Sequence, residues 1–309
     1  MKSIDKIRCP ACSHESYAPL SYGGYYYKNI EMPLVRCLGC KLMYVVHGLS
    51  KQEMDAFYNE HSYFEAEYGG GAAVNYLANK LEQDEKANLA LSIIHRFEQK
   101  GRLLEIGCAG GYLLEVARDK FGYDVAGVEL SEEMCAEGRA RGLDIFCGSI
   151  EDAPVEWQKF DVIYLGDVLE HIATPKPFMD AINGRLNIGG QVAIELPLTY
   201  NLTLSGIVIG LVNLLKGNWG YQYFLPAQHR RNYANKPPYH VLMFNRASIR
   251  SFLKLYGFRV RYLKIYEGKP KEKFSGSWYG RFKALTHWLT FYFPQNFLGD
   301  RIFVVAEKI

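Results

Sequence analysis

The chain has 309 residues, of which 49% are hydrophobic and 22% are charged, with a formal net charge of +3. This composition predicts a globular protein with one large and one small domain, and the low charge without a basic stripe excludes a protein that tracks nucleic acid phosphates. No apolar signal segment opens the sequence and no run of about 20 apolar residues could span a bilayer, so we expect a cytoplasmic protein without a transmembrane segment.

Four of the seven cysteines form two C-x-x-C pairs near the N-terminus, Cys9/Cys12 and Cys37/Cys40. Two such pairs can bring four thiolates to one tetrahedral zinc ion, which then has no open position for a substrate. We therefore expect structural Zn²⁺. A redox dithiol is the alternative, but it fits one pair better than two. The pattern predicts a zinc-ribbon-like module with its linker over residues 1–67 and a larger domain over residues 68–309.

The larger domain is expected to open with a helix over residues 75–100, after which short apolar strands alternate with amphipathic helices. We expect strands at residues 102–107, 124–129, 144–147, 160–165, 191–196, 258–266 and 301–307, and helices at residues 112–120, 132–141, 175–186 and 247–256. Such alternation implies right-handed crossovers and a parallel sheet. The predicted fold is therefore α/β, with a doubly wound, mostly parallel seven-stranded sheet.

A glycine-rich loop follows the first of these strands, in the sequence LLEIGCAGG at residues 103–111. Glycine lets the backbone turn sharply and lets its N–H groups approach a ligand closely. Glu129 closes the next strand, where a carboxylate can accept hydrogen bonds from a ribose diol. The combination favours a nucleotide-type cofactor, and the alternative is an ordinary turn without a ligand.

The loop lacks the G-x-G-x-x-G spacing of a dinucleotide site, which disfavours a nicotinamide dehydrogenase. It resembles the first motif of class I S-adenosylmethionine-dependent methyltransferases, acid-x-Gly-x-Gly-x-Gly, with Glu105 as the acid and Ala109 in place of the middle glycine. Later motifs of that superfamily resemble residues 147–154, 160–172, 185–197 and 239–260. The resemblance covers roughly residues 101–266 and implies a Rossmann-like fold, S-adenosylmethionine as cofactor and methyl transfer as activity.

The resemblance also implies a role for individual residues. Glu105 would orient the methionine amine, the backbone near Gly107 and Gly111 would pass the methionine part, Glu129 would bind the ribose, and Ile150 would pack on adenine. The expected cofactor-binding residues are Glu105, Gly107, Cys108, Ala109, Gly111, Tyr112, Glu129, Leu130, Ser149, Ile150, Glu151 and Gly166.

The methyl group of a sulfonium is already activated, so the enzyme mainly aligns it with the acceptor, and a hydroxyl acceptor also needs a general base. Asp167 and His171 follow the fourth expected strand and His240 lies downstream, which makes these three the candidate catalytic residues. A structural role in a loop or against a helix is the alternative for Asp167 and His171. No Asp/Asn/His set suggests Mg²⁺, so we expect metal-independent chemistry. Arg230 and Arg231 could bind a phosphate of the acceptor.

The paired cysteine knuckles resemble the N-terminal module of bacterial methyltransferases of polysaccharide and natural-product sugar pathways. This resemblance implies a small-molecule acceptor, namely a hydroxyl of a sugar, nucleotide-sugar or glycan, including sugar phosphates. The alternative from another class is a non-catalytic zinc-ribbon interaction protein with a methyltransferase-like scaffold.

Two apolar segments lie in insertions at residues 200–240 and 267–299. Residues 202–215 carry no charge and predict a buried or lid helix, whereas residues 274–298 are crowded with aromatic side chains. For the aromatic segment we rank core or interface first, an acceptor pocket second and a membrane surface third. A homodimer therefore remains open.

Overall fold

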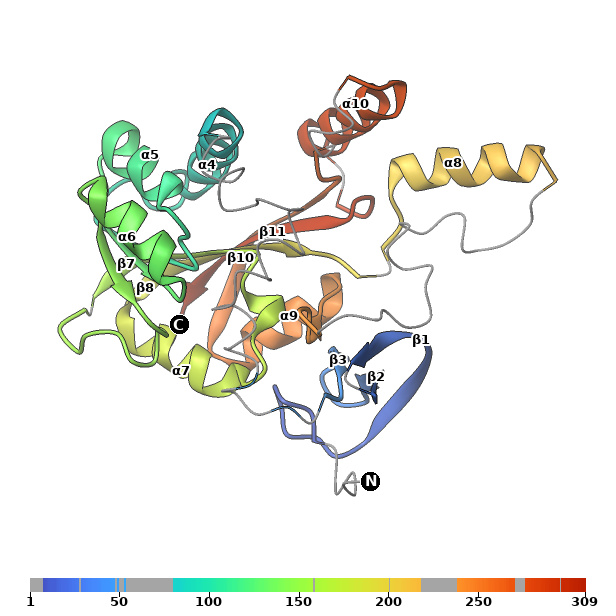
Figure 1. Cartoon of the computed structure of the whole chain (residues 1–309), viewed down its shortest axis with the longest axis horizontal. Coiled ribbons are helices and arrows are strands. Elements are labelled where there is room, and N and C mark those ends of the chain that lie inside the picture. Colours follow the sequence, from blue (N-terminus) through green and yellow to red (C-terminus); the bar gives the residue numbers. More distant parts are fainter. Residues whose placement is uncertain are drawn as a thin grey trace. The chain divides into compact units, whose positions relative to one another are not determined.

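A computed structural model of the chain describes residues 8–27, 29–47, 49, 53, 80–157, 159–199, 201–217, 238–269, 276–294 and 296–309. The chain forms two compact units, neither of which is continuous in sequence. Figure 1 labels the helices and strands. The first unit consists of residues 1–47, 195–255 and 260–304, and the second consists of residues 48–194, 256–259 and 305–309. The predicted division at residue 67 lies outside the described residues and stays a prediction.

From residue 80 onward, the second unit has helix α4 and then alternates strands and helices. Its elements are α4 (Lys80–Ile94), β4 (Arg102–Ile106), α5 (Tyr112–Phe121), β5 (Asp124–Glu129), α6 (Glu132–Ala140), β6 (Asp144–Cys147), β7 (Phe160–Gly166), the 3₁₀ turn η1 (Leu169–His171), α7 (Pro175–Arg185) and most of β8 (Leu186–Pro197). Local sequence explains several boundaries. The Ser131 side chain accepts a hydrogen bond from the N–H of Met134 and caps α6, Pro175 occupies the first turn of α7, and Gly122 ends α5 in a left-handed conformation.

Seven strands follow one another across the main sheet in the order β10-β11-β8-β7-β4-β5-β6, where β10 is Phe258–Tyr266 and β11 is Arg301–Lys308. The pairs β4–β5, β4–β7 and β5–β6 are parallel. The chain runs outward from β4 to β6 and then returns to the other side of β4 with β7. Ligands of doubly wound sheets bind at the carboxyl ends of the strands at such a switch point, which places the candidate site beside the ends of β4, β5 and β7.

The described residues of the first unit form a four-stranded sheet in the order β1-β2-β3-β9 and the helices α8, α9 and α10. Its elements are β1 (Tyr17–Tyr27), β2 (Ile30–Cys37), β3 (Met43–Val45), α8 (Leu204–Leu215), β9 (Leu242–Met243), α9 (Arg246–Leu255) and α10 (Trp278–Tyr292). Neighbouring strands of this small sheet pair antiparallel. Cys37 of the second cysteine pair therefore ends a strand of a sheet that β9, from much later in the sequence, completes.

The predicted fold is confirmed, because the seven-stranded α/β sheet and almost every expected element are present. Two boundaries were wrong. Helix α4 ends at Ile94 rather than residue 100, because the chain tightens there into bonds from Phe97 N–H to the Ile94 carbonyl. Strand β8 begins at Leu186 rather than residue 191, since Gly189 takes a left-handed φ of 77° within the strand instead of ending it.

The apolar segments differ more from expectation. Both form helices, α8 and α10, but their large apolar side chains are exposed or half-buried and none is fully buried, so burial in a core was wrong, whereas a lid or an interface stays a prediction. Serine, threonine and glycine occupy the buried positions instead. Among the described residues, no helix combines the length and apolar character that a membrane crossing requires.

Candidate functional site

The loop after β4 turns sharply toward β5. The N–H groups of Gly107 and Cys108 both donate to the carbonyl of Val128, at 2.8 and 3.1 Å. Gly107 has a φ of 71°, and a Cβ on this residue would lie 2.6 Å from Cγ2 of Val168. Gly111 has a φ of 80°, and its Cβ would lie 2.3 Å from Cδ1 of Leu143. The left-handed backbone favours glycine at both positions, and close packing against Val168 adds to this preference at Gly107.

Glu129 closes β5 and holds this loop in place. Its Oε2 accepts a hydrogen bond from the N–H of Ala109 at 2.8 Å, and its Oε1 accepts bonds from the N–H groups of Leu130 and Ser131 at 2.8 and 2.9 Å. Burial raises the pKa of Glu129, although the three N–H donors oppose the shift. A carboxylate has about four acceptor sites, so one remains for a donor from a ligand.

Glu105 lies at the end of β4, opposite Gly127 in the pairing with β5. Its side chain is buried, and its Oε2 has no hydrogen-bond partner among the described residues. Burial raises the pKa of Glu105 well above its ordinary value, and the negative charge of Glu129 raises it further. A buried carboxylate without a partner is costly, so this position fits a ligand that brings a cation or a hydrogen-bond donor.

The next segment begins after β6. Ile150 is buried, whereas Ser149 is half-buried and donates from its hydroxyl to Oδ2 of Asp152 at 2.6 Å. The N–H of Asp152 in turn donates to the carbonyl of Ser149 at 3.1 Å. Sequence reasoning missed Asp152, which supplies a carboxylate beside the serine. The signal was present in the segment GSIED, where a second acid follows Ser149 by three residues.

Arg141, also missed from the sequence, supports the glycine loop from the end of α6. Its guanidinium donates to the carbonyl of Gly110 and to Oε2 of Glu115, the latter at 3.1 Å. It also lies 4.4 Å from the centroid of the Tyr112 ring, and Lys80 lies 5.2 Å from the same centroid. Tyr112, a predicted cofactor residue, therefore already contacts two cations through its ring.

The remaining predicted cofactor residues lie around the same strand ends. The Cys108 side chain is buried and packs toward Gly127, where a Cβ would come within 2.6 Å of its sulfur. Leu130 follows β5, Glu151 is half-buried in the turn after β6, and Gly166 is the last residue of β7. These four residues stay predictions as cofactor contacts.

The candidate bases of the second unit follow β7. Asp167 is exposed and has a left-handed φ of 55°, a conformation that aspartate tolerates better than most residues. His171 ends the turn η1, and its Nε2 lies 3.9 Å from Oε1 of the buried Glu170. His240 belongs to the first unit, where it is half-buried between Tyr239 and Val241. The three candidates stay predictions.

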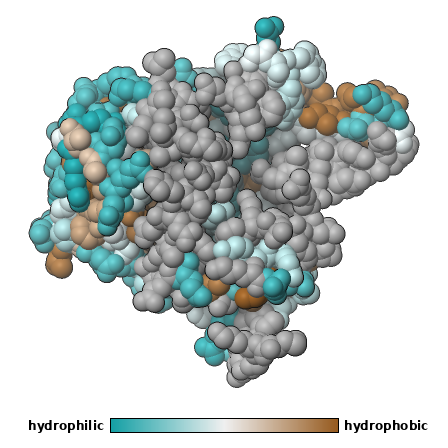
Figure 2. Space-filling model, in the orientation of Figure 1, coloured by the Kyte–Doolittle hydropathy of each residue, from teal (hydrophilic) through white to brown (hydrophobic). Residues whose placement is uncertain are grey.

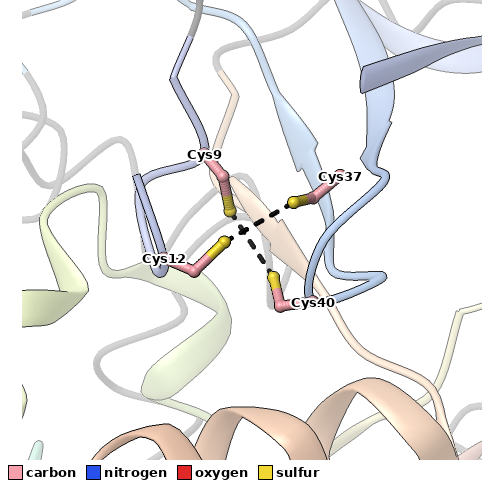
Figure 3. Close-up of side chains that lie close together, drawn as sticks. All are labelled: Cys9, Cys12, Cys37 and Cys40. Carbon is pink, nitrogen blue, oxygen red and sulfur yellow. Dashed lines mark hydrogen bonds between the residues drawn. The ribbon is translucent and has the colours of Figure 1, made fainter. Parts of the chain in front are cut away.

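Cys9, Cys12, Cys37 and Cys40 form one cluster in the first unit (Figure 3), with all four sulfur atoms within 4.8 Å of one another. The distances Cys9 Sγ–Cys40 Sγ and Cys12 Sγ–Cys37 Sγ are both 3.6 Å, too long for disulfides. Four sulfurs bound to a tetrahedral zinc ion at about 2.3 Å lie about 3.8 Å apart. The cluster therefore has the size that a four-thiolate zinc site requires.

Each cysteine pair lies in its own backbone turn, and the two turns have the same geometry. The N–H of Cys9 donates to the carbonyl of His14 at 2.9 Å, and the N–H of Cys37 donates to the carbonyl of Leu42 at 2.9 Å. The residue after the second cysteine is left-handed in each pair, with φ of 59° at Ser13 and 66° at Lys41.

The ionisation of this cluster is uneven. A hydrogen bond from Cys9 lowers the pKa of Cys40 to about 5, even though burial opposes the shift. The same hydrogen bond raises the pKa of Cys9. Because the thiolate is the form that binds a metal, this shift makes Cys40 a ready ligand.

Arg230 and Arg231, predicted to contact a phosphate, lie outside the described residues. No structural observation therefore tests that prediction.

Comparison with known proteins identifies a family that this chain matches. A family model described as a methyltransferase domain matches residues 79–263. The chain is 32% identical over 142 residues to a ubiquinone biosynthesis O-methyltransferase of Xylella fastidiosa (strain 9a5c), covering 41% of this chain and 56% of that protein. The protein of the same name from Coxiella burnetii (strain Dugway 5J108-111) is 30% identical over 140 residues, covering 41% and 58%. The chain thus spans about half the length of these curated relatives.

Among solved structures, a SAM dependent methyltransferase from Archaeoglobus fulgidus is similar to 73% of this chain and 94% of that chain. The sequence identity is 15% and the TM-score is 0.45.

Proposed function

The chain belongs to the methyltransferase domain family, and we propose that it transfers a methyl group from S-adenosylmethionine to a hydroxyl group of a small molecule. The observation that carries this proposal is the pair of carboxylates beside the glycine loop. Oε2 of the buried Glu105 has no hydrogen-bond partner among the described residues, and Glu129 borders the same loop with acceptor capacity left. An ammonium group and a ribose diol, both present in S-adenosylmethionine, fit these two needs.

Different residues would contact different parts of the cofactor. Glu105 would accept hydrogen bonds from the ammonium group, Glu129 from a ribose hydroxyl, and the side chain of Ile150 would contact the adenine ring. Gly107 would let the backbone pass close to the methionine part, because a side chain there has no room. The cofactor supplies a methyl group that its positively charged sulfur already activates.

The transfer forms a bond between the acceptor oxygen and the methyl carbon and breaks the bond from that carbon to sulfur, so the hydroxyl proton must leave. His171 is our first candidate to take it. The buried carboxylate of Glu170 lies 3.9 Å from its Nε2 and would stabilise the resulting imidazolium. Asp167 and His240 remain the other candidates.

Oxygen as the accepting atom is supported by the names of the relatives, which describe O-methyltransferases. The proposed acceptor classes are a sugar, a nucleotide-sugar or glycan, as the cysteine module suggests, and a precursor in ubiquinone biosynthesis, as the names of the relatives suggest. The four cysteines would hold a structural zinc ion, since four sulfur ligands leave no place for substrate.

The test has two stages. Calorimetry with S-adenosylmethionine should show one site per chain, and Glu129→Ala should weaken binding, whereas Glu133→Ala, at an exposed position of α6, should not. Methyl transfer is then measured on a panel of sugars and a panel of ubiquinone precursors by formation of S-adenosylhomocysteine. Absence of binding at millimolar cofactor would overturn the whole proposal. Binding without turnover on either panel would favour the alternative of a non-catalytic scaffold that binds partners.

A further inference from the structure

Helix α8 has the opposite burial pattern to an ordinary surface helix, with small residues buried and large apolar residues exposed. Its sequence, LSGIVIGLVNLL, contains no charged residue, yet its buried positions are the small residues Ser205, Gly206 and Gly210. Leu211 and Leu215 are exposed, and Leu215 exposes 89% of its surface. Figure 2 shows hydrophobic residues gathered over this helix. An amphipathic helix of a soluble domain would place these leucines against the core instead.

Helix α10 packs against α8 and has the same burial pattern. Its buried positions are Gly280, Thr286 and Thr290, whereas Trp278 exposes 77% of its surface and Trp288 exposes 52%. Further exposed aromatic and aliphatic residues of the segment are Tyr279, Leu285, Tyr292, Phe293 and Phe297. Contiguous exposed apolar surface of this kind marks an interaction site.

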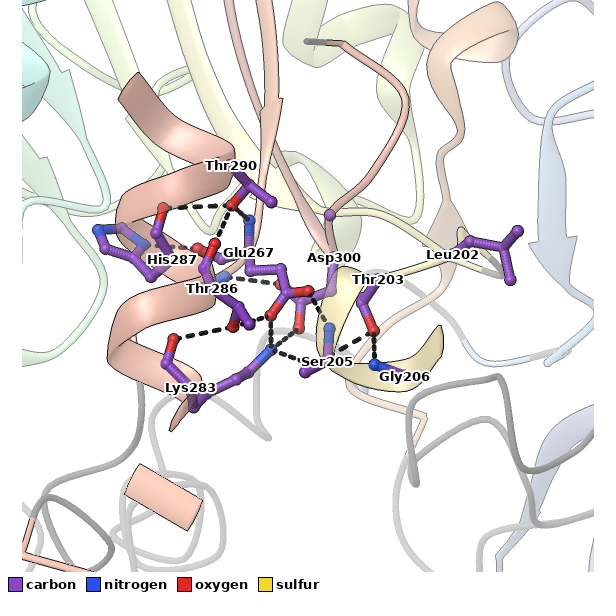
Figure 4. A network of polar contacts seen from close by, with 12 residues as sticks. Leu202, Thr203, Ser205, Gly206, Glu267, Lys283, Thr286, His287, Thr290 and Asp300 are labelled. Carbon is purple, nitrogen blue, oxygen red and sulfur yellow. Dashed lines mark hydrogen bonds and ion pairs between the residues drawn. The ribbon is translucent and has the colours of Figure 1, made fainter. Parts of the chain in front are cut away.

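A polar network on the inner side explains why the apolar residues face outward (Figure 4). Glu267 is fully buried and accepts hydrogen bonds from the Ser205 N–H at 2.7 Å and from the Thr286 hydroxyl at 2.6 Å. Lys283 of α10 bonds to Glu267 at 3.0 Å and to Asp300 at 3.2 Å. Because these bonds join the start of α8 to the middle of α10, the pair is held with its polar and small residues inward.

The charged residues within the two helical segments have one sign. Residues 202–217 and 276–298 contain no aspartate or glutamate, and their positive residues are Lys216, Arg281 and Lys283. Lys283 belongs to the buried network, whereas Lys216 and Arg281 are exposed. The two charged side chains that these segments expose, Lys216 and Arg281, are therefore both positive, which complements an anionic surface.

We propose that the exposed faces of α8 and α10 bind the surface of a bilayer that contains anionic phospholipids. Tryptophan and tyrosine favour the boundary between lipid and water, and leucine favours the acyl region. The helices have 12 and 15 residues, so at 1.5 Å per residue they are too short to cross about 30 Å of hydrocarbon and would lie in the plane of the interface.

A second copy of the chain is a poorer occupant. In a two-fold dimer the same patch meets itself, so Lys216 and Arg281 would face a surface that has no acidic residue of its own. Anionic headgroups supply the missing negative charge.

The experiment is flotation of the full-length protein with vesicles of phosphatidylcholine alone or mixed with phosphatidylglycerol. The protein should float with the anionic vesicles, and added salt should reduce the bound fraction. The double variant Leu215→Gln/Trp288→Gln should lower vesicle partitioning by about tenfold or more, because each side chain loses apolar burial. The matched control is Val155→Gln/Ile188→Gln, which removes two side chains exposed at 76% and 79% in the second unit and should leave binding unchanged.

Three results would overturn the proposal. The first is absence of flotation with anionic vesicles at low salt. The second is unchanged flotation of the Leu215/Trp288 variant. The third is a dimer, measured by light scattering, that dissociates on the Leu215/Trp288 substitutions while neither protein binds vesicles. That result would assign the surface to a second copy.

Discussion

The N–H of Ala109 donates a hydrogen bond to Oε2 of Glu129 over 2.8 Å, so the loop after β4 is fixed to the last residue of β5. The two residues thus form one structural unit, and Glu129 shapes the loop as well as offering an acceptor to a ligand. Removal of the carboxylate therefore acts on both the loop and the ligand.

The first prediction separates these effects. Glu129→Gln keeps two acceptor sites but loses the charge, whereas Glu129→Ala leaves three backbone N–H groups without their acceptor. Hydrogen bonds to a charged group contribute about 1.5–3 kcal/mol, so Glu129→Ala should raise the cofactor dissociation constant by about tenfold to 100-fold, and Glu129→Gln by less. Calorimetry measures the affinity and thermal unfolding measures the apo protein. Equal affinity of Glu129→Ala and wild type would contradict the role of Glu129.

The second prediction concerns Ala109, whose φ of 44° is left-handed. A left-handed L-residue costs about 1–2 kcal/mol, and glycine in its place loses about 0.4–1 kcal/mol through the entropy of the unfolded chain. The first term is larger, so Ala109→Gly should stabilise the protein by about 0.5–1 kcal/mol. Chemical denaturation of the variant checks this, and a lower midpoint would show that the loop is not strained at Ala109.

Much of the fold and part of the candidate site could be predicted because they depend on local sequence. The strand ending at Glu105, the glycines at 107 and 111 and the acid at 129 follow a spacing that the parallel sheet turns into proximity. Arg141 could not be found in this way. Its contact with the Gly110 carbonyl depends on how α6 packs beside the loop, and no local pattern records it.

The burial of the two apolar helices could not be predicted for a different reason. Hydrophobic sequence indicates that a face will be covered, but not whether the cover comes from the same chain. From the sequence, Lys283 is expected to be an ordinary surface residue. Only its bond to the buried Glu267, 16 residues earlier, shows that this side of α10 faces inward.

The third prediction concerns the protonation of Glu105. Its pKa is raised, so the folded state holds this proton more tightly than the unfolded state, and its contribution to stability is present at low pH and lost as the pH rises through the folded pKa. At neutral pH, Glu105→Gln should therefore raise the melting temperature of the apo protein, and this gain should shrink toward pH 4.5. The same substitution should weaken cofactor binding, because an ammonium group favours the carboxylate.

Calorimetry in buffers of different ionisation enthalpy gives a second measurement of Glu105. Wild-type protein should release a proton on binding at pH values below the raised pKa, and Glu105→Gln should release less. Identical proton release in the two proteins would show that the ligand cation does not meet Glu105.

The fourth prediction concerns the cysteine cluster. The purified protein should contain one zinc ion per chain, and Cys12→Ser should lose it together with the protection of β2 and β3 against hydrogen exchange, since β2 ends at Cys37. Cys147→Ser, which changes a half-buried cysteine of the second unit, is the matched control and should retain the metal. A zinc content well below one per chain in wild type would contradict a structural site.

The last prediction concerns the ion pair between Lys283 and Glu267. Burial lowers the pKa of Lys283, but the charges of Asp300 and Glu267 outweigh this effect and raise it. The stability from this lysine should accordingly persist below pH 10.5 and be lost as the pH rises through the folded pKa. Lys283→Met should cost about 3–5 kcal/mol, because it leaves the fully buried Glu267 charged and without its cation.

The double variant Lys283→Met/Glu267→Gln tests the cause of that loss. It removes both charges, so it should unfold at a higher denaturant concentration than Lys283→Met alone, although Ser205 and Thr286 keep a neutral acceptor. If the two variants were equally unstable, the cost would come from lost packing of the lysine side chain rather than from an unpaired buried charge. Lys283→Arg keeps the charge in a larger side chain and separates these two causes further. It should recover most of the lost stability if the loss is electrostatic, and little of it if the loss comes from packing.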